Sequence, residues 1–198
     1  MLSVSIYRTL PGLMEKDNSC LIRKACGKDA PALAAVEAAC FTAEEAADET
    51  TFRRRIQTFP DSFFKAECSG LIVGLIDGGC TSQPFIDDSM YSSASCGHDP
   101  QGCYQAVFGL AVIPEYRHRG IASSLMRRME ENARRSGRRG IILTCRKFRI
   151  YWYESLGFRC EGPSRSVHGG GIWYNMIMEW TAHSVQMTEE GRLSSGGR

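Results

Sequence analysis

The hydrophobic and polar positions change period along the chain, and these changes mark a succession of strands and helices. Apolar runs of strand length predict strands at residues 20–26, 62–67, 70–79, 104–112, 140–145 and 171–180. Apolar residues three and four apart predict helices at residues 29–41, 47–59, 119–136 and 148–158. Because strands alternate with helices and a hairpin is expected at Ser69-Gly70, we predict a mixed α/β sheet.

This periodic part defines one predicted domain, residues 20–181. Residues 1–19 and 182–198 have no sustained period and are expected to form a flexible leader and a flexible tail. Residues 79–103 are rich in Ser, Asp, Gly and Cys, so we expect a long mobile connection with one short helix near Asp88.

The segment from Val112 to Ala133 joins the continuous apolar strand to the longest predicted helix. The apolar stripe of this helix consists of Ile121, Ala122, Leu125, Met126, Met129 and Ala133. Basic residues and Gly120 precede the stripe, at the place where a helix N-terminus has unpaired amide groups. These amides, the helix dipole and the side chains of Arg117 and Arg119 predict an anion site. A solvated basic helix start is the alternative interpretation.

Two positions elsewhere in the pattern need a local explanation. Gly109 lies inside the apolar strand 104–112, where glycine is unfavourable unless the strand has a bulge or another group approaches closely. Asp29 precedes the first predicted helix, with Pro31 in its first turn, and is expected to be the N-cap.

Composition limits the classes of protein to which the chain can belong. A net charge of +2 over 198 residues does not suit nucleic-acid binding by the whole protein. Arginines of the helix 119–136 alternate with Glu130 and Glu131, which indicates a solvated face with local ion pairs. No apolar run has the length of a membrane helix, and the N-terminus lacks a signal-peptide pattern. We therefore expect a cytoplasmic protein that binds neither nucleic acid nor membranes.

The nine cysteines are odd in number, and no two have the CxxC spacing. Most lie inside or beside apolar runs, as small buried residues do in a reducing compartment. We therefore expect neither a disulfide framework nor a metal site.

The stretch Arg117-His118-Arg119-Gly120-Ile121-Ala122 resembles the Q/R-x-x-G-x-G/A signature of the GNAT superfamily of acyl-CoA-dependent N-acyltransferases. The preceding strand 108–112 and the later segment 152–158 resemble two more motifs of that family, in the same order. The resemblance covers residues 20–180 and implies the GNAT acyl-CoA-binding fold. In that fold a central, mostly antiparallel sheet has a bulged and splayed fourth strand, with helices on both faces. The resemblance also implies acetyl-CoA as co-substrate and no metal.

The same resemblance implies site residues. Leu110, Ala111 and Val112 would bind acetyl-CoA along the splayed strand. The loop that holds its pyrophosphate would consist of Arg117, His118, Arg119, Gly120, Ile121, Ala122 and Ser123. The positions that contact the acceptor substrate would be Leu110, Thr144, Tyr153, His168 and Trp173.

Within the superfamily, the chain is most similar to the arylalkylamine (serotonin-type) N-acetyltransferase branch, over residues 59–79, 98–102, 142–164 and 167–176. It departs from that branch on the central strand. Vertebrate members have two histidines there that relay the substrate proton, whereas this chain has Ala106 and Phe108. The proton acceptor must therefore differ.

Amine acetylation requires a neutral amine, a stabilised oxyanion and a protonated leaving thiolate. We expect the Val112 amide to contact the thioester carbonyl and Tyr153 to donate a proton to the sulfur. For the base, His168 is the first candidate, and His98, Glu44, Glu45 and a water chain are the others. Cys145 is expected to be a buried small residue rather than an acyl carrier.

The predicted function is acetyl transfer from acetyl-CoA to a primary amine by direct attack in a ternary complex. The expected acceptor is a small arylalkylamine or a polyamine, and the protein is expected to be a monomer or weak dimer. Two alternatives stay open: a CoA-binding module without catalysis, and an acetyltransferase that acts on peptide or protein amines.

Overall fold

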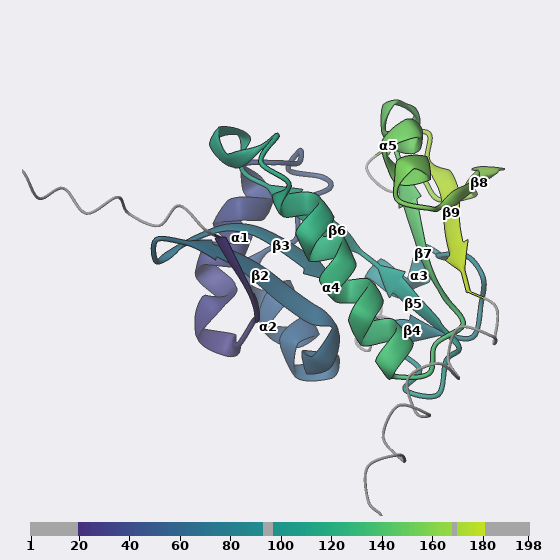
Figure 1. Cartoon of the computed structure of the whole chain (residues 1–198), viewed down its shortest axis with the longest axis horizontal. Helices are drawn as coiled ribbons and strands as arrows, with labels where there is room; N and C mark the ends of the chain where they lie inside the picture. The colour runs from purple at the N-terminus through teal and green to yellow at the C-terminus, as the bar shows by residue number, and fades with distance from the viewer. Residues whose placement is uncertain (1–19, 93–96, 168–169, 181–198) are drawn as a thin grey trace, which may run out of the picture.

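The computed structural model describes residues 20–92, 97–167 and 170–180. The leader and tail predicted from the sequence lie outside these residues. Within them the predicted mixed α/β fold is confirmed, but the strands form two sheets that share the segment 104–112 instead of one continuous sheet (Figure 1).

The first sheet is antiparallel throughout and has the order β1-β2-β3-β6. Its strands are β1 Cys20–Lys24, β2 Phe63–Cys68, β3 Leu71–Asp77 and β6 Gly109–Val112. The predicted hairpin joins β2 to β3 through Ser69 and Gly70, which both have positive φ (50° and 82°). Such a pair is typical of the tight turns that suit the twist of antiparallel strands.

The second sheet has the order β4-β5-β7-β9-β8, and only β5 and β7 pair in parallel. Its strands are β4 Cys80–Thr81, β5 Tyr104–Val107, β7 Gly140–Cys145, β8 Arg159–Pro163 and β9 Tyr174–Glu179. The short edge strands β4 and β8 were not predicted from the sequence. The apolar run 104–112 therefore contributes one strand to each sheet, and Phe108 lies at the junction.

Helices cover both faces of the first sheet. The helices are α1 Ala30–Ala38, α2 Glu49–Thr58, α3 Ser89–Ser92, α4 Ile121–Arg135 and α5 Ile150–Ser155. Short 3₁₀ turns occur at Gly27–Asp29, Pro60–Ser62, Pro114–Tyr116 and Lys147–Arg149. In Figure 1, α4 crosses in front of the strands while α1 and α2 lie behind the first sheet. Because neighbouring residues of a strand point to opposite faces, Phe63 packs with α1 and α2 and Phe64 packs with α4.

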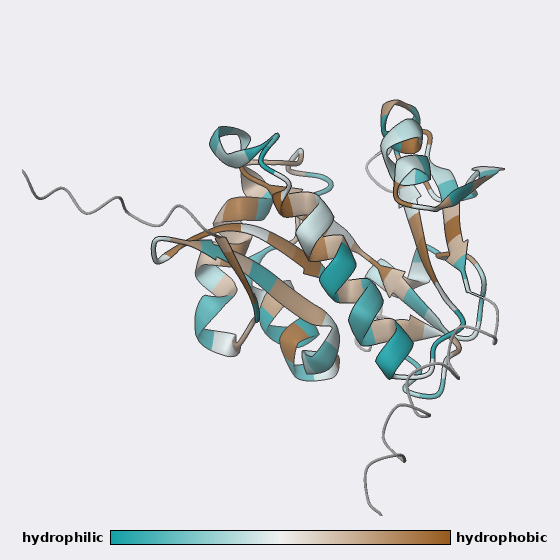
Figure 2. Cartoon of the chain, in the orientation of Figure 1, coloured by the Kyte–Doolittle hydropathy of each residue, from teal (hydrophilic) through white to brown (hydrophobic). Residues whose placement is uncertain are grey.

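The predicted apolar stripe of α4 forms the centre of the main core. Ile121, Leu125, Met126, Met129 and Ala133 are buried, whereas Ala122 is half-buried. The opposite face is polar, as Figure 2 shows, and it carries the expected ion pairs. Arg134 contacts Glu130 at 2.9 Å and Arg128 contacts Glu131 at 3.6 Å.

The connection after β3 is more ordered than expected. The predicted helix near Asp88 is confirmed as α3, but Ile86 and Met90 are buried against Ala106 and Ile142 of the second sheet. The described residues of this connection therefore cover one face of that sheet and do not form the loose loop that its composition suggested.

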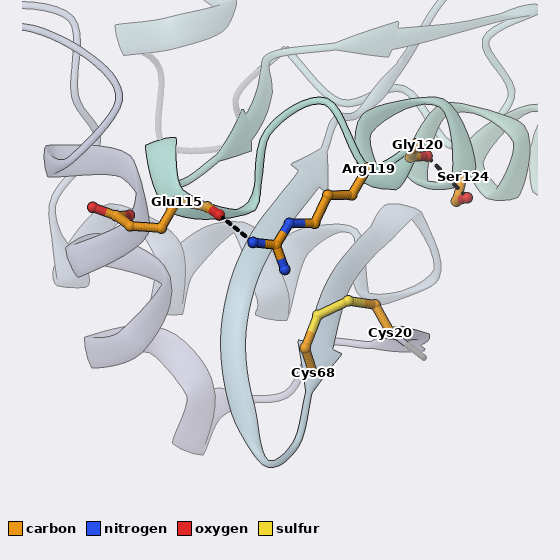
Figure 3. Close-up of a disulfide and its surroundings, with 6 residues drawn as sticks. All are labelled: Cys20, Cys68, Glu115, Arg119, Gly120 and Ser124. Carbon is orange, nitrogen blue, oxygen red and sulfur yellow. Dashed lines mark hydrogen bonds between the residues drawn. A yellow bond between two sulfur atoms is a disulfide. The ribbon is translucent and has the colours of Figure 1, made fainter. Parts of the chain in front are cut away.

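The expected N-cap is confirmed in position, since Asp29 directly precedes α1 and Pro31 lies in the first turn. Its side chain does not cap the helix, because the carboxylate is buried and accepts bonds from the Cys26 amide and from Lys65 (both 2.9 Å). The expectation that the cysteines form no disulfide is wrong. Cys20 and Cys68 form a disulfide (Figure 3). The two cysteines are direct cross-strand partners in β1 and β2. They are close because of the register of these strands, which the spacing of cysteines along the sequence does not reveal.

No helix in the described part of the chain is long and apolar enough to span a membrane.

Candidate functional site

The two sheets separate where one strand leaves its neighbour. β5 pairs with β7 from Tyr104 opposite Gly140 to Val107 opposite Leu143. Beyond this point β6 pairs only with β3, while Thr144 and Cys145 pair only with β9. The ladder between the two central strands therefore ends at Val107, and β6 has an unpaired edge toward β7.

Ladder geometry identifies the backbone groups on this edge. The Ile113 amide donates to the Val73 carbonyl at 3.0 Å, so Ile113 and every second residue before it point their polar groups toward β3. Leu110 and Val112 consequently point their polar groups away from β3. The Val112 carbonyl accepts bonds from Cys40 Sγ (3.3 Å) and Arg117 Nε (2.9 Å). The amides of Leu110 and Val112 face the open edge, where a ligand can pair with them as an added strand would.

The loop after β6 leads into a helix N-terminus with available donors. Gly120 is the N-cap of α4 in a left-handed conformation (φ 76°), and His118 is also left-handed (φ 60°). The first helical bond runs from the Ser124 amide to the Gly120 carbonyl (3.0 Å), so the amides of Ile121, Ala122 and Ser123 have no partner within the helix. Alternating left-handed residues before a helix form a concave set of donors that suits an anion. A Cβ on Gly120 would meet nothing within 4 Å.

The arginines of this loop bind the loop itself. Arg117 donates to the Val112 carbonyl, at the bond already given. Arg119 donates to the Glu115 carbonyl at 2.8 Å, which Figure 3 shows, and its guanidinium lies 4.9 Å from the Tyr116 ring centre. The backbone amides are therefore the donors of this loop that remain available to a ligand, and these two side chains stabilise its shape.

Tyr153 lies in α5, and its ring packs edge-on against Trp152 and Phe158. Burial raises the pKa of its hydroxyl, so the group is protonated throughout the neutral range. Thr144, half-buried in the part of β7 that has left β5, lies 3.4 Å from the hydroxyl of Tyr91. Thr144 therefore lies on the β7 side of the open edge, and Tyr153 packs in the same core cluster as Cys145 at the end of β7.

A bridge of side chains connects the α1–α2 loop to the second sheet. Arg146, directly after β7, forms an ion pair with Glu45, and its guanidinium lies 4.2 Å from the ring centre of Trp173. Glu45 therefore has a cationic partner, and Trp173 is held against the end of β7.

The other base candidates are His168, His98 and Glu44. His168 lies outside the described residues. His98 accepts a bond from the Cys80 amide at Nδ1 (3.0 Å), and burial lowers its pKa, which favours the neutral imidazole. Glu44 is exposed to solvent. Cys145 is buried, and burial raises the pKa of its thiol to about 12, which suits the expected small core residue.

Sequence reasoning missed a buried charged cluster beside the start of β6. It consists of Glu37 of α1, Arg55 of α2 and Asp77 of β3, which are 4%, 5% and 0% exposed. Arg55 Nη1 binds Asp77 Oδ2 at 3.0 Å. A Cβ on Gly109 would lie 2.7 Å from Asp77 Oδ1 and 3.6 Å from Glu37 Oε1. Gly109 is therefore the point at which the carboxylates approach the backbone of β6.

An unpaired strand edge beside a helix N-terminus with available amide donors is the arrangement of an acyl-CoA-binding fold. A family profile described as an acetyltransferase (GNAT) domain matches residues 60–160, which is 101 of the 198 residues. The chain belongs to this family. It is an acyl-CoA-dependent N-acetyltransferase by class, and acetyl-CoA is its co-substrate.

Solved structures share the fold at low sequence identity. A GphF GNAT-like decarboxylase in complex with isobutyryl-CoA is 22% identical with a TM-score of 0.68, covering 80% of this chain and 98% of that one. The yncA putative acetyltransferase from Salmonella typhimurium with acetyl-CoA is 17% identical with a TM-score of 0.63, and the match covers 84% of this chain and 97% of that one. The ribosomal-protein-S18-alanine N-acetyltransferase from Escherichia coli is 18% identical with a TM-score of 0.61, and the match covers 81% of this chain and 94% of that one. Comparison with curated protein sequences found no match.

Proposed function

We propose that the protein transfers the acetyl group of acetyl-CoA to a primary amine by direct attack within a ternary complex. The observation that carries this proposal is the open edge of β6, with the Leu110 and Val112 amides next to the donors at the N-terminus of α4. The edge suits the amide groups of a pantetheine arm, and the helix N-terminus suits a pyrophosphate.

Each step of the transfer has a candidate group near this edge. The loop from Arg117 to Ser123 binds the pyrophosphate, mainly through its backbone amides. The Val112 amide donates to the thioester oxygen as negative charge develops on it. Tyr153 donates to the sulfur that leaves. Its raised pKa makes complete proton transfer to a thiolate harder than in solution, so a hydrogen bond to the developing thiolate is its main contribution.

The acceptor side is the less specific part of the proposal. The resemblance to the arylalkylamine branch favours a small arylalkylamine or polyamine, in contact with Leu110, Thr144, Tyr153, His168 and Trp173. None of the three similar structures is named for such an amine, and one is named for an alanine of ribosomal protein S18. Peptide amines are therefore the second candidate class.

Thiol release from acetyl-CoA, measured over a panel of amines and short peptides, tests the proposal. We expect release above the uncatalysed rate with at least one acceptor, and acetylated product at the amine nitrogen by mass spectrometry. Calorimetric titration with CoA is the control for a functional donor site. A protein that binds CoA but releases thiol with no acceptor would be a binding module and would contradict the proposed transfer.

A further inference from the structure

Asn175 of β9 lies beside the part of β7 that has separated from β5. It is the direct cross-strand partner of Thr144, and directly opposed residues of an antiparallel pair place their side chains on the same face of the sheet. Two residues further along each strand, Ile142 and Ile177 are paired on that face. Both isoleucines belong to the core cluster that contains Met90 of α3. Asn175 and Thr144 therefore continue this apolar face beyond the end of the β5–β7 ladder.

Aromatic rings form a wall next to Thr144 at this end of the face. The Tyr91 hydroxyl lies 3.4 Å from Thr144 Oγ1, so these two hydroxyl groups bond each other. The Tyr91 ring packs edge-on against Phe108, the residue at the junction of the two sheets, with 5.6 Å between the ring centres. On the other side of Asn175, its partner in β8 is Gly162, which has no side chain. The sheet thus provides no side chain directly opposite Asn175 on that side.

The carboxamide of Asn175 has an incomplete set of hydrogen bonds. Its Oδ1 atom is buried and accepts no hydrogen bond from the described residues. Gln105 of β5 is different, because its Oε1 accepts from the Ser62 hydroxyl and its Nε2 donates to the Gly79 and Ala106 carbonyls, each at 2.9 Å. A buried carbonyl oxygen without a donor costs free energy unless a ligand or water supplies one. Asn175 Oδ1 is therefore an acceptor that is available to a ligand at the end of β7.

We infer that Asn175 determines acceptor specificity, because its Oδ1 accepts a hydrogen bond from a second, uncharged donor on the acceptor amine. This inference rests on the proposed function, in which Thr144 contacts the acceptor. A hydroxyl group or an amide N–H is a suitable donor. A second ammonium group is not, since a neutral carboxamide beside apolar rings does not compensate a buried charge. The favoured acceptors are then hydroxylated amines or peptides, and an alkylamine without a second donor is a poor acceptor.

Pairs of acceptors that differ in one donor test the inference in the wild-type protein. Amino alcohols of increasing chain length are compared with the alkylamines in which a methyl group replaces the hydroxyl, and phenylethylamine is compared with its ring-hydroxylated form. Short peptides are compared with ester analogues in which oxygen replaces the first amide N–H. The member with the donor should have a kcat/KM about 10–100-fold higher in at least one pair, the effect of one unmet buried hydrogen bond. The kind of pair that responds distinguishes a hydroxylated amine from a peptide.

Asn175→Leu tests the residue itself, because leucine branches at the same atom as asparagine and has no polar group. The ratio of kcat/KM within the responsive pair should fall to near unity in this variant. Gln105→Met is the matched control, since it removes a carboxamide whose hydrogen bonds are complete. It should lower the melting temperature more than Asn175→Leu does and leave the ratio unchanged.

The outcomes separate this inference from the proposed function. If the wild type acetylates both members of every pair equally well, or if Asn175→Leu keeps the wild-type ratio, the inference is wrong while the proposed function stands. If the wild type binds CoA but acetylates nothing, both are wrong.

A charged variant covers the case in which Asn175→Leu does not fold. Asn175→Asp keeps an acceptor oxygen at the same position and adds a negative charge, which favours a charged donor. The kcat/KM for a diamine should therefore rise about tenfold or more relative to that for the amino alcohol of equal length, the gain of a charge-assisted hydrogen bond. An unchanged ratio between diamine and amino alcohol in Asn175→Asp would contradict the inference.

Discussion

A Cβ atom on Gly109 would lie 2.7 Å from Oδ1 of Asp77, closer than Cβ atoms in folded proteins approach such a neighbour. The φ of Gly109 is not in the left-handed region, so this glycine is required by space and not by backbone conformation. The same contact brings the buried carboxylates against the first residue of β6. It explains why a glycine occurs in an otherwise apolar strand.

Gly109→Ala should therefore push Asp77 or β6 out of place. Because Asp77 is also held by Arg55, we expect a loss of stability of about 1–3 kcal/mol, typical of an overpacked core. Gly27→Ala is the control, since a Cβ there would meet nothing within 4 Å. Urea unfolding of both variants gives the comparison, and equal stabilities would contradict the close contact.

Gly120→Val should weaken acetyl-CoA binding, because the new side chain enters the space in front of the α4 amides. Loss of one charge-assisted hydrogen bond to phosphate corresponds to about 10–100-fold in affinity. Gly137→Val is the matched control: Gly137 follows the other end of α4, has φ 72°, and also meets nothing within 4 Å. Both glycines have a left-handed φ, so valine is strained at either position. Calorimetry that finds equal CoA affinity in the two would exclude the anion-binding loop.

Tyr153→Phe removes one hydroxyl and keeps the ring contacts with Trp152 and Phe158. If the hydroxyl donates a hydrogen bond to the departing thiolate, kcat should fall by about 10²–10³-fold with little change in CoA affinity. Tyr104→Phe is the control, because Tyr104 is a buried tyrosine of β5 whose hydroxyl binds Glu179 at 2.7 Å. Loss of the Tyr104 hydroxyl should lower the stability of the protein but not its kcat. A near-normal kcat in Tyr153→Phe would remove Tyr153 from the mechanism.

Glu37 should make stability depend on pH. Burial and then the negative charge of Asp77 outweigh the opposing charge of Arg55 and raise its pKa from 4.5 to about 8, so the folded state binds the proton more tightly than the unfolded state does. The resulting stabilisation is complete below pH 4.5 and is lost as the pH rises through 8. Each pH unit in this range costs about 1.4 kcal/mol, so the total is on the order of a few kcal/mol. The free energy of unfolding of the wild type should therefore fall relative to that of Glu37→Gln as the pH rises between these values. If urea unfolding finds the same difference between the two proteins at every pH, Glu37 does not hold a buried proton.

The disulfide between Cys20 and Cys68 closes a loop with a sequence separation of 48 residues. Closing a loop of this length stabilises a domain by about 3–4 kcal/mol. Reductant should therefore lower the melting temperature of the wild type and leave a Cys20→Ser/Cys68→Ser double variant unaffected. Thiol titration of the denatured protein should find two more thiols after reduction than before. No difference would show that the two cysteines are free.

The local structure of the candidate donor site could be predicted from the sequence because the segment is contiguous. Strand β6, the loop at Gly120 and the start of α4 follow one another within residues 109–124, so each element positions the next. Local rules for strands, glycines and helix starts are sufficient for such a segment. The predicted helix 119–136 differs from α4 by two residues at its start and one at its end.

The carboxylate cluster could not be predicted in the same way, because its members come from α1, α2 and β3. A single glutamate four residues after Leu33 in an alanine-rich helix does indicate that Glu37 faces the core. An aspartate at the end of an apolar strand indicates the same for Asp77. Neither pattern shows that the two side chains meet at Gly109, since that depends on how the helices pack on the sheet. The disulfide could not be predicted for a similar reason, because it depends on the register of β1 against β2.

The division of residues 104–112 between two sheets has a consequence for synthesis of the chain. The first sheet has all its strands once Val112 has been made, and its covering helix α4 is complete at Arg135. The second sheet needs β9, which ends at Glu179, because β7 lies between β5 and β9. A chain that folds as it leaves the ribosome can therefore form its first half while β7 still lacks one neighbour. The interval between the emergence of β7 and that of β9 is when an unpaired strand is most exposed to other chains.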